Sequence, residues 1–294
     1  MQGKLPATSL GVTASLVTYR NPARQIERLI RSLHGSRALL RVAVFDNSPD
    51  DSLRSVVDAT GALYLRARSN MGFGAGHNRA IHSLLKLGAA YHLVINPDIE
   101  CHPDVIDALY EFMEGNPEIG LVMPRILNPD GTQQPLCKLL PSPFDLFARR
   151  FLGRMGASFF RKQHARYHLQ NLDMQQPREI PCLSGCFMFL RRAAIEKAGL
   201  FDERFFMYME DVDLCRRIGQ RFKTALYPNV AVRHEYAKGS YKDPKLLAYH
   251  MHSAIRYFSK WGWIFDADRK LRNQRTSAIG AAGERRRDSG QRVA

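Results

Sequence analysis

The first part of the chain alternates apolar runs of strand length with amphipathic segments of helical period. The apolar runs that predict buried strands are residues 11–19, 41–46, 62–67, 91–96 and 119–126. The segments with helical spacing are residues 22–34, 52–59, 77–87 and a stretch that begins at Pro103. Because strands alternate with helices, we expect an α/β fold with a mostly parallel, Rossmann-like central sheet and helices on both faces.

The second part of the chain is less regular. Strand patterns return at residues 180–190 and 222–227, and helical patterns cover residues 193–198, 210–219 and 245–261. We expect a single domain over residues 8–265, made of a first half (8–127), an insertion (140–177) and a second half (178–265). Residues 266–294 are polar and basic, and the sequence predicts a disordered tail there.

Composition narrows the class of protein. The chain has 294 residues, of which 45% are hydrophobic, and this is enough for one large α/β domain. Its net charge of +15 favours an anionic partner such as nucleotide phosphates, nucleic acid or an anionic membrane surface. The five cysteines lack a zinc-binding spacing, and no apolar run resembles a signal peptide or a membrane-spanning helix. We therefore expect reduced thiols and a cytoplasmic protein that is soluble or peripheral to a membrane.

A glycine-rich stretch, SNMGFGAGHNRAI (residues 69–81), leads into a predicted helix. Such loops allow the backbone to approach a phosphate, and Asp98 follows Gly76 at roughly the 20-residue spacing of a dinucleotide-binding fold. In that fold, however, the glycine turn follows the first strand. Here it follows the third strand and the polar residues 66–69. The position therefore favours a nucleotide-proximal loop that makes room for a sugar nucleotide rather than for NAD.

Polar residues stand where three of the predicted parallel strands end. Tyr19 follows the first strand, Asp46 and Asn47 the second, and Asn96-Pro97-Asp98 the fourth. Ligands of open α/β sheets bind at this edge, and a carboxylate at Asp98 suits a hard cation that bridges phosphate oxygens. The alternative is that Asp and Asn merely begin loops, as they often do.

A second acidic group begins the helix predicted at 210–219, where acids are commonly satisfied by the helix dipole. Asp213 has Arg216 and Arg217 three and four residues later, so its ordinary role is a surface ion pair. Asp211 has no such partner and shares a face with apolar residues. A carboxylate in this position is partly desolvated, as general bases often are.

Eight motifs in a fixed order carry a resemblance to a known family. They are LVTYRNP (16–22), VFDNSPDD (44–51), NMGFGAGHNRAI (70–81), INPDIE (95–100), PRILNPDG (124–131), CLSGCFMFLRR (182–192), GLFDERFFMYMEDVDLCRR (199–217) and the stretch that ends in HEYAKGS (234–240). The sequence resembles inverting glycosyltransferases of the large family 2, which have the GT-A fold. Within that family it most resembles bacterial rhamnosyltransferases that build O-antigen and other cell-wall glycans.

The resemblance implies a role for each matching residue. Asp211 falls at the position of the catalytic base, and Asp98 with His234 at the positions of metal contacts. The residues implied in nucleotide binding are Thr18, Tyr19, Asp46, Asn47, Asn70, Gly74 and Asn96. Gly185, Cys186 and Glu210 are implied on the side of the acceptor and the transferred sugar. Because a diphosphate leaves more easily when its charge is neutralised, the basic residues Arg233 and Lys238 are further candidates. Asn96 replaces the first Asp of the family's Asp-x-Asp motif, so Asp98 carries the metal almost alone.

The implied reaction is the transfer, with inversion, of L-rhamnose from dTDP-rhamnose to a polyprenyl-diphosphate-linked saccharide, with Mg²⁺ or Mn²⁺ as cofactor. Residues 8–127 are then the nucleotide-sugar half and residues 178–265 the acceptor half. The protein is expected at the cytoplasmic face of the bacterial inner membrane, and the basic, aromatic segment 144–162 is one hypothesis for the contact, the other being an ordinary amphipathic helix. Transfer of another sugar, such as galactofuranose or a UDP-linked hexose, is an alternative, as is a nucleotide-binding protein without activity. Nucleic-acid binding is disfavoured, because the basic residues are dispersed and no recognised module is present.

Overall fold

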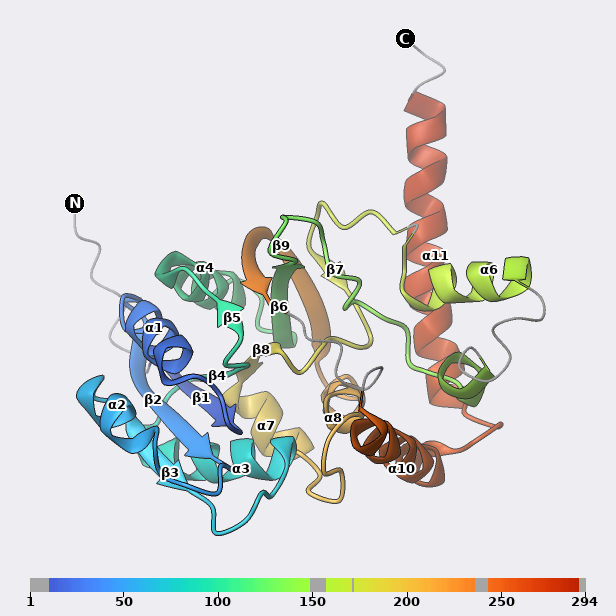
Figure 1. The fold of residues 1–294 in the computed structure, drawn as a ribbon. Helices are drawn as coiled ribbons and strands as arrows, with labels where there is room; N and C mark the ends of the chain where they lie inside the picture. The colour runs from blue at the N-terminus through green and yellow to red at the C-terminus, as the bar shows by residue number, and fades with distance from the viewer. Residues whose placement is uncertain (1–10, 149–156, 171, 236–242, 291–294) are drawn as a thin grey trace.

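The computed structural model describes residues 11–148, 157–170, 172–235 and 243–290, with the side chains of 147–160 and 279–290 excepted. Within these residues the chain forms one nine-stranded sheet, with β7 beside β9 and the other strands in the order β3-β2-β1-β4-β8-β6-β9-β5 (Figure 1). The strands are β1 (Val12–Thr18), β2 (Leu39–Asp46), β3 (Leu63–Arg66), β4 (Tyr91–Ile95), β5 (Ile99–Glu100), β6 (Ile119–Leu127), β7 (Arg178–Glu179), β8 (Phe187–Arg191) and β9 (Lys223–His234).

Most of the sheet is parallel. Strands β3, β2, β1 and β4 run in one direction, and so do the parallel neighbours β6 and β9. β8 runs the opposite way between these two groups, and the short strands β5 and β7 are antiparallel to β9. The expectation of an α/β fold with a mostly parallel sheet is therefore confirmed.

Helices cover both faces of the sheet, as the alternation in β2 illustrates. Val42 and Val44 belong to the core cluster that includes the apolar side chains of α1 and α2, whereas Ala43 and Phe45 belong to a cluster with Ala80 of α3. Alternate strand residues point to opposite faces, so α1 and α3 lie on opposite sides. The helices of the first half are α1 (Ala23–Leu33), α2 (Arg54–Ala59), α3 (Phe73–Leu84), the short η1 (Leu85–Leu87) and α4 (Pro103–Glu114).

Helix α3 begins four residues before the expected start at residue 77. Gly72 precedes it with φ of +86°, and a Cβ at this position would lie 2.1 Å from the carbonyl oxygen of Phe206. Only glycine allows this backbone to turn so closely past another chain segment. Two glycines of the predicted loop, Gly74 and Gly76, therefore belong to the first turn of the helix.

The second half adds α7 (Arg192–Ala198), α8 (Glu210–Ile218), α10 (Pro244–Trp261) and α11 (Ala267–Gly290). Helix α11 occupies the segment that the sequence predicts to be disordered, and it extends away from the sheet in Figure 1. Its first turns are fixed to the domain, since the Asn273 side chain exchanges hydrogen bonds of 2.9 Å with the backbone of Leu140. The polar composition misled the prediction because these partners lie far away in sequence.

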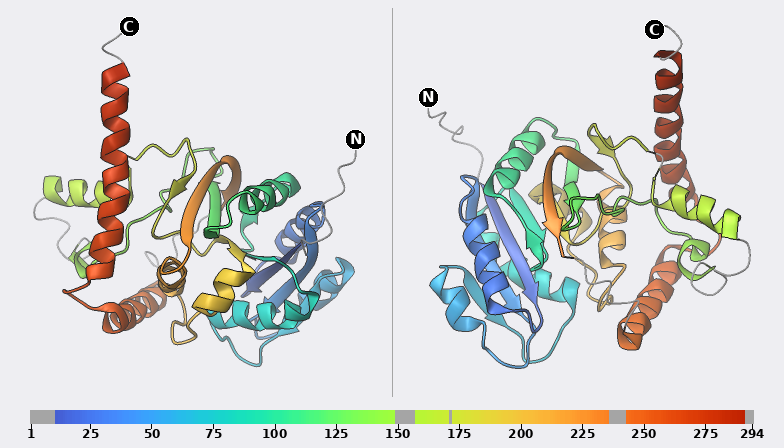
Figure 2. Two further views of the ribbon diagram at one scale, coloured as in Figure 1. Left: turned by 180° about the vertical axis from the view of Figure 1, so that it is seen from behind. Right: turned by 45° about the horizontal axis from the view of Figure 1, so that its top comes forward.

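The insertion carries η2 (Phe144–Ala148), a single π-helical turn, and α6 (Ala157–Tyr167), and both lie near the start of α11 (Figures 1 and 2). Most of the aromatic side chains that suggested a membrane contact here, at residues 147–160, fall outside the described side chains. None of the helices in the described part of the chain combines the length and the apolar composition needed to cross a membrane.

Candidate functional site

The ends of β1 and β2 form the first part of the candidate site around the buried carboxylate of Asp46. One oxygen accepts hydrogen bonds from the Thr18 hydroxyl at 3.0 Å and the Ser48 backbone N–H at 2.9 Å. The other accepts from the Tyr64 hydroxyl at 2.9 Å. Burial and this hydrogen bond raise the pKa of Tyr64, which keeps its hydroxyl a donor. Tyr19, directly after β1, is 49% exposed, and the Arg20 guanidinium lies 5.4 Å from the centroid of its ring.

Asn47 connects this carboxylate to the glycine stretch. Its side chain accepts from the Met71 N–H at 3.0 Å and donates to the Gly72 carbonyl at 3.1 Å. Asn70 accepts from the Gly72 N–H at 2.9 Å, so side chains hold the tight turn from both sides. The sequence thus places Thr18, Asp46, Asn47, Asn70 and Gly72 in one continuous hydrogen-bonded edge.

The start of α3 packs against the segment that leads into α8. The Phe73 N–H donates to the Phe206 carbonyl at 3.0 Å. A Cβ at Gly74 would lie 2.9 Å from the Cβ of Phe201 and 3.7 Å from that of Glu210, so only a glycine permits this approach. Glu210 is buried here, and burial, with the neighbouring carboxylate of Asp211, raises its pKa well above the usual value.

Asp211 lies in the first turn of α8 and is half-buried. One of its carboxylate oxygens accepts from the Gly185 N–H at 2.9 Å, and the other accepts from the Val212 N–H at 2.8 Å. A Cβ at Gly185 would lie 3.2 Å from the Cβ of Asp211, which accounts for a small residue at that point. No Lys or Arg of the described ranges forms an ion pair with Asp211, as the sequence predicts.

Cys186 joins this carboxylate to the end of β4. Its backbone carbonyl accepts from the Asn96 N–H at 2.9 Å, and Asn96 opens the turn to Asp98. Gly185 and Cys186 therefore lie between the Asp211 carboxylate and the Asn96-Pro97-Asp98 turn. The Cys186 thiol is buried, which raises its pKa to about 12 and leaves it an unreactive filler of the site.

Asp98 and His234 meet at the edge of the sheet, where β5 pairs with β9. The Asp98 Oδ1 atom lies 3.3 Å from His234 Nε2, and the Asp98 side chain keeps 25% exposure. Gln134 forms two hydrogen bonds with His234 on the side away from Asp98. It donates from Nε2 to the His234 carbonyl at 2.8 Å and accepts at Oε1 from His234 Nδ1 at 3.0 Å. Because Gln134 accepts there, Nδ1 carries the ring proton, and Nε2 faces Asp98.

This arrangement fits a divalent cation. Asp98 Oδ1 is buried and accepts no hydrogen bond from the described residues, and an imidazole nitrogen adjoins it. A carboxylate and an imidazole whose far nitrogen is held by a hydrogen bond are a common partial ligand set. No group of three or more His, Cys, Asp or Glu side chains within the described ranges forms a complete metal cage, so substrate oxygens or water must supply further ligands.

The two basic residues expected near the diphosphate have different outcomes. Lys238 falls outside the described residues. Arg233 precedes His234 on β9, so its side chain points to the opposite face of the strand. There it lines a cavity with Arg28 and Leu29 of α1, away from the Asp98–His234 pair.

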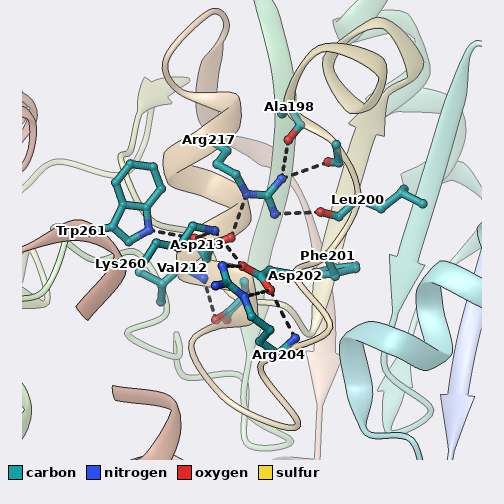
Figure 3. A network of polar contacts seen from close by, with 12 residues as sticks. Ala198, Leu200, Phe201, Asp202, Arg204, Val212, Asp213, Arg217, Lys260 and Trp261 are labelled. Atoms are coloured by element: carbon teal, nitrogen blue, oxygen red, sulfur yellow. Dashed lines mark hydrogen bonds and ion pairs between the residues drawn. The ribbon is translucent and has the colours of Figure 1, made fainter. Parts of the chain in front are cut away.

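Asp213 is buried in a charged network, not paired on the surface as the sequence predicts (Figure 3). Its carboxylate contacts Arg217 Nε at 2.8 Å, Lys260 Nζ at 2.7 Å and the Trp261 Nε1–H at 2.8 Å. Arg217 also donates to three carbonyls at the end of α7 and directly after it, those of Ala198, Gly199 and Leu200. The network fixes α8, and hence Asp211, relative to α7 and α10.

Sequence reasoning missed Tyr64 and Gln134, which hold Asp46 and His234. Tyr64 lies on β3, and only the parallel pairing of β2 with β3 brings it to Asp46. Gln134 is 100 residues from His234 along the chain. Neither residue has a local sequence signal, since both contacts depend on tertiary structure.

A family model described as "Glycosyltransferase like family 2" matches residues 11–268. The N-acetylglucosaminyl-diphospho-decaprenol L-rhamnosyltransferase of Mycobacterium tuberculosis is 31% identical over 267 residues, which cover 86% of this chain and 83% of that protein.

Solved structures share the fold at low sequence identity. A mannosyltransferase from Pyrobaculum calidifontis, determined with GDP-Man and Mn²⁺, aligns with a TM-score of 0.54 and 16% identity, covering 92% of this chain and 75% of that one. TarS 1-349 from S. aureus aligns with a TM-score of 0.50 and 14% identity, covering 76% of this chain and 60% of that one. These neighbours confirm the expected GT-A fold.

Proposed function

Because the chain belongs to the family 2 glycosyltransferases, we propose that it transfers L-rhamnose from dTDP-rhamnose, with inversion, to a polyprenyl-diphosphate-linked saccharide. The activity of the mycobacterial relative supports this choice of sugar and acceptor class. The observation that carries the proposal is the position of Asp211, whose carboxylate is joined through Gly185 and Cys186 to the Asn96-Pro97-Asp98 turn. On this proposal the protein works at the cytoplasmic face of a bacterial inner membrane, where such acceptors are held.

The ends of β1 and β2 are proposed to bind the nucleotide. Asp46 is oriented by Thr18, Ser48 and Tyr64, and its buried carboxylate is proposed to accept the ring N–H of a pyrimidine base that enters beside it. The exposed ring of Tyr19 provides a surface on which the base stacks. Asn70 and the start of α3 then lie beside the ribose and diphosphate.

Asp98 and His234 are proposed to hold Mg²⁺ or Mn²⁺ together with the diphosphate oxygens. When bound, such an ion neutralises the charge that develops on the leaving nucleoside diphosphate. Gln134 keeps the His234 ring in the orientation and tautomer that direct Nε2 toward Asp98. The chain therefore needs no second carboxylic acid to protonate the leaving group, in contrast to most glycosidases.

Asp211 is proposed to accept the proton of the attacking acceptor hydroxyl. Backbone N–H groups from Gly185 and Val212 fix the direction of its carboxylate, and partial exposure leaves room for an acceptor. The hydroxyl oxygen attacks the anomeric carbon as the bond to the diphosphate breaks on the opposite side, which inverts the configuration. The proton passes to Asp211 and the electron pair of the broken bond leaves with the diphosphate.

The test is Asp211→Asn, which preserves shape but removes the base. We expect the turnover rate to fall by roughly 10²- to 10⁴-fold, while calorimetry shows unchanged binding of the sugar nucleotide. Asp104→Asn on α4, an exposed acid away from the site, is the matched control and should retain full activity. Near-normal turnover of Asp211→Asn would refute the assignment of the base.

The donor is tested separately by measuring transfer and binding across dTDP-, UDP- and GDP-sugars with Mg²⁺ or Mn²⁺. The proposal predicts preference for dTDP-rhamnose. Preference for UDP-galactofuranose or another UDP-linked hexose would change the identity of the donor sugar but not the assignment of the site residues. Tight nucleotide binding with no transfer to any acceptor would indicate a binding protein instead.

A further inference from the structure

The turn that joins α10 to α11 exposes three consecutive apolar side chains. Trp263 is 41% exposed, Ile264 77% and Phe265 94%, and the last two are the most exposed large hydrophobic side chains among the described residues. A single exposed hydrophobic residue is ordinary, but a contiguous group of them marks a contact surface. Residues 263–265 form the apolar loop.

The apolar loop is held from both ends. Gly262 ends α10 with φ of +103°, and a Cβ there would lie 2.8 Å from the Phe265 carbonyl oxygen, so the turn is tight. Asp266, directly after the loop, has a side chain that is only 2% exposed and forms an ion pair with the equally buried Arg216. The loop therefore presents its apolar side chains from a fixed support.

The charge around the loop is positive. Asp266 and Asp268, the acids nearest to it in the sequence, are paired with three cations, Arg216, Arg269 and Arg272. Lys270 and Arg275 are exposed on α11 and form no ion pair with described residues, and the exposed Leu271 adds apolar surface between them. Apolar and aromatic side chains flanked by uncompensated cations have the chemistry of a membrane interface that contains anionic lipids.

We infer that the apolar loop inserts into the surface of an anionic membrane. Trp263 suits the headgroup level, while Ile264 and Phe265 reach the acyl boundary. The inserted segment 140–177 begins beside α11, the helix that follows the apolar loop. Arg269 of α11 donates to the Pro141 carbonyl at 3.3 Å, and Asn273 exchanges hydrogen bonds with the backbone of Leu140. Helix α6 lies beside α11 (Figures 1 and 2), and its exposed Arg161 and Lys162 add further positive charge to this half of the molecule.

Helix α10 links the apolar loop to the candidate site. The other end of this helix packs on the segment before Asp211, where the rings of Tyr249 and Phe206 lie 4.6 Å apart. With 18 residues, α10 is about 27 Å long. The inference deepens the proposed function, since a membrane held at the loop brings a polyprenyl-linked acceptor within about one helix length of the base.

The test is binding of the full chain to vesicles in the absence of any sugar nucleotide. The unaltered protein should sediment with vesicles of phosphatidylcholine that contain about a third phosphatidylglycerol, bind pure phosphatidylcholine far less, and lose binding as salt is raised. The double variant Ile264→Ser/Phe265→Ser should bind about 100-fold more weakly, given the transfer free energy of two large apolar side chains. Its matched control, Leu85→Ser/Leu87→Ser, removes two exposed leucines of η1 and should bind normally.

Tryptophan emission supplies an independent readout, because the chain has two tryptophans and Trp261 is engaged with Asp213. Emission should shift to the blue with anionic vesicles, and Trp263→Phe should abolish the shift without abolishing binding. Equal binding by both double variants, or no shift, would overturn the inference, as would a concentration-dependent dimer that the Ile264→Ser/Phe265→Ser variant loses. Because no transfer is measured, these outcomes do not depend on whether the proposed reaction is correct.

Discussion

Two buried polar networks support the two halves of the domain, and they differ in charge. In the second half, Asp213, Arg217 and Lys260 form an ionic network that joins α8 to α7 and α10 (Figure 3). In the first half, hydroxyl and imidazole groups form a chain without formal charge between β1, β4 and α3. The ionic network holds α8, which carries Asp211, and the uncharged network holds β1 and α3, which lead to the proposed nucleotide site. The difference shows two ways of keeping a functional side chain in place.

The uncharged chain consists of four side chains joined by hydrogen bonds of 2.8 Å. Thr13 Oγ1 meets His92 Nδ1, Ser15 Oγ meets His92 Nε2, and Ser15 Oγ also meets His77 Nδ1. Burial lowers the pKa of both histidines, of His92 to about 3. The uncharged network should lose stability when its histidines are protonated, whereas the ionic network should lose stability when one charged partner is removed.

The largest effect should come from removing the centre of the ionic network. Asp213→Ala leaves Arg217 without a carboxylate partner and Lys260 with Asp202 alone, and we expect the free energy of unfolding to fall by about 3–5 kcal/mol in chemical denaturation. The matched control is Glu196→Ala on α7, where the ion pair with Arg192 has the same four-residue spacing but is exposed. That change should cost only about 0.3–0.5 kcal/mol. Comparable losses would remove the distinction between the two sites.

The contrast between these acids also shows what the sequence reveals. Asp46, Asp98 and Asp211 could be proposed from sequence because strand ends and helix starts have local patterns, and parallel strands bring their ends to one edge. The burial of Asp213 could not, because its environment is created by Lys260 and Trp261, almost 50 residues away. The helical spacing correctly predicts the ion pair with Arg217, but the exposure of Asp213 depends on how α10 packs.

Much of the fold follows from the same reasoning. The five predicted strands of the first half all form, since apolar runs bounded by turns are local signals. The antiparallel insertion of β8 between β4 and β6 has no such signal, because strand order is set by long-range pairing. The sequence does not predict helix α11 for a related reason, because the first turns of this helix depend on contacts with Arg216 and Leu140.

Acid should have an intermediate effect on the free energy of unfolding, through the uncharged network that contains His77 and His92. Below about pH 6.5 the histidines of the unfolded chain bind protons that His77 and His92 in the folded protein do not. The free energy of unfolding should therefore fall as the pH drops from about 6.5 toward about 3, by up to about 1.4 kcal/mol per pH unit for each histidine. Denaturation curves at pH 7, 6 and 5 measure this slope.

Two variants assign the slope. His92→Gln removes one titrating group from the chain and should reduce the dependence on pH by about one proton. His102→Gln removes an exposed histidine directly before α4 and should leave the slope unchanged. If the free energy of unfolding of His92→Gln depends on pH as steeply as that of the unaltered protein, the buried histidine network does not make the fold sensitive to acid.

The smallest effect should come from a neutral contact that orients a single ring. Gln134→Met keeps the volume but removes both hydrogen bonds to His234, so the ring is no longer held with Nδ1 protonated and Nε2 toward Asp98. We expect Mn²⁺, titrated by electron paramagnetic resonance with thymidine diphosphate present, to bind about tenfold more weakly. Gln133→Met changes the adjacent, exposed glutamine and should bind Mn²⁺ normally. Equal affinities of the two variants would show that neutral hydrogen bonds do not set the geometry at this edge of the sheet as they do between β1 and α3.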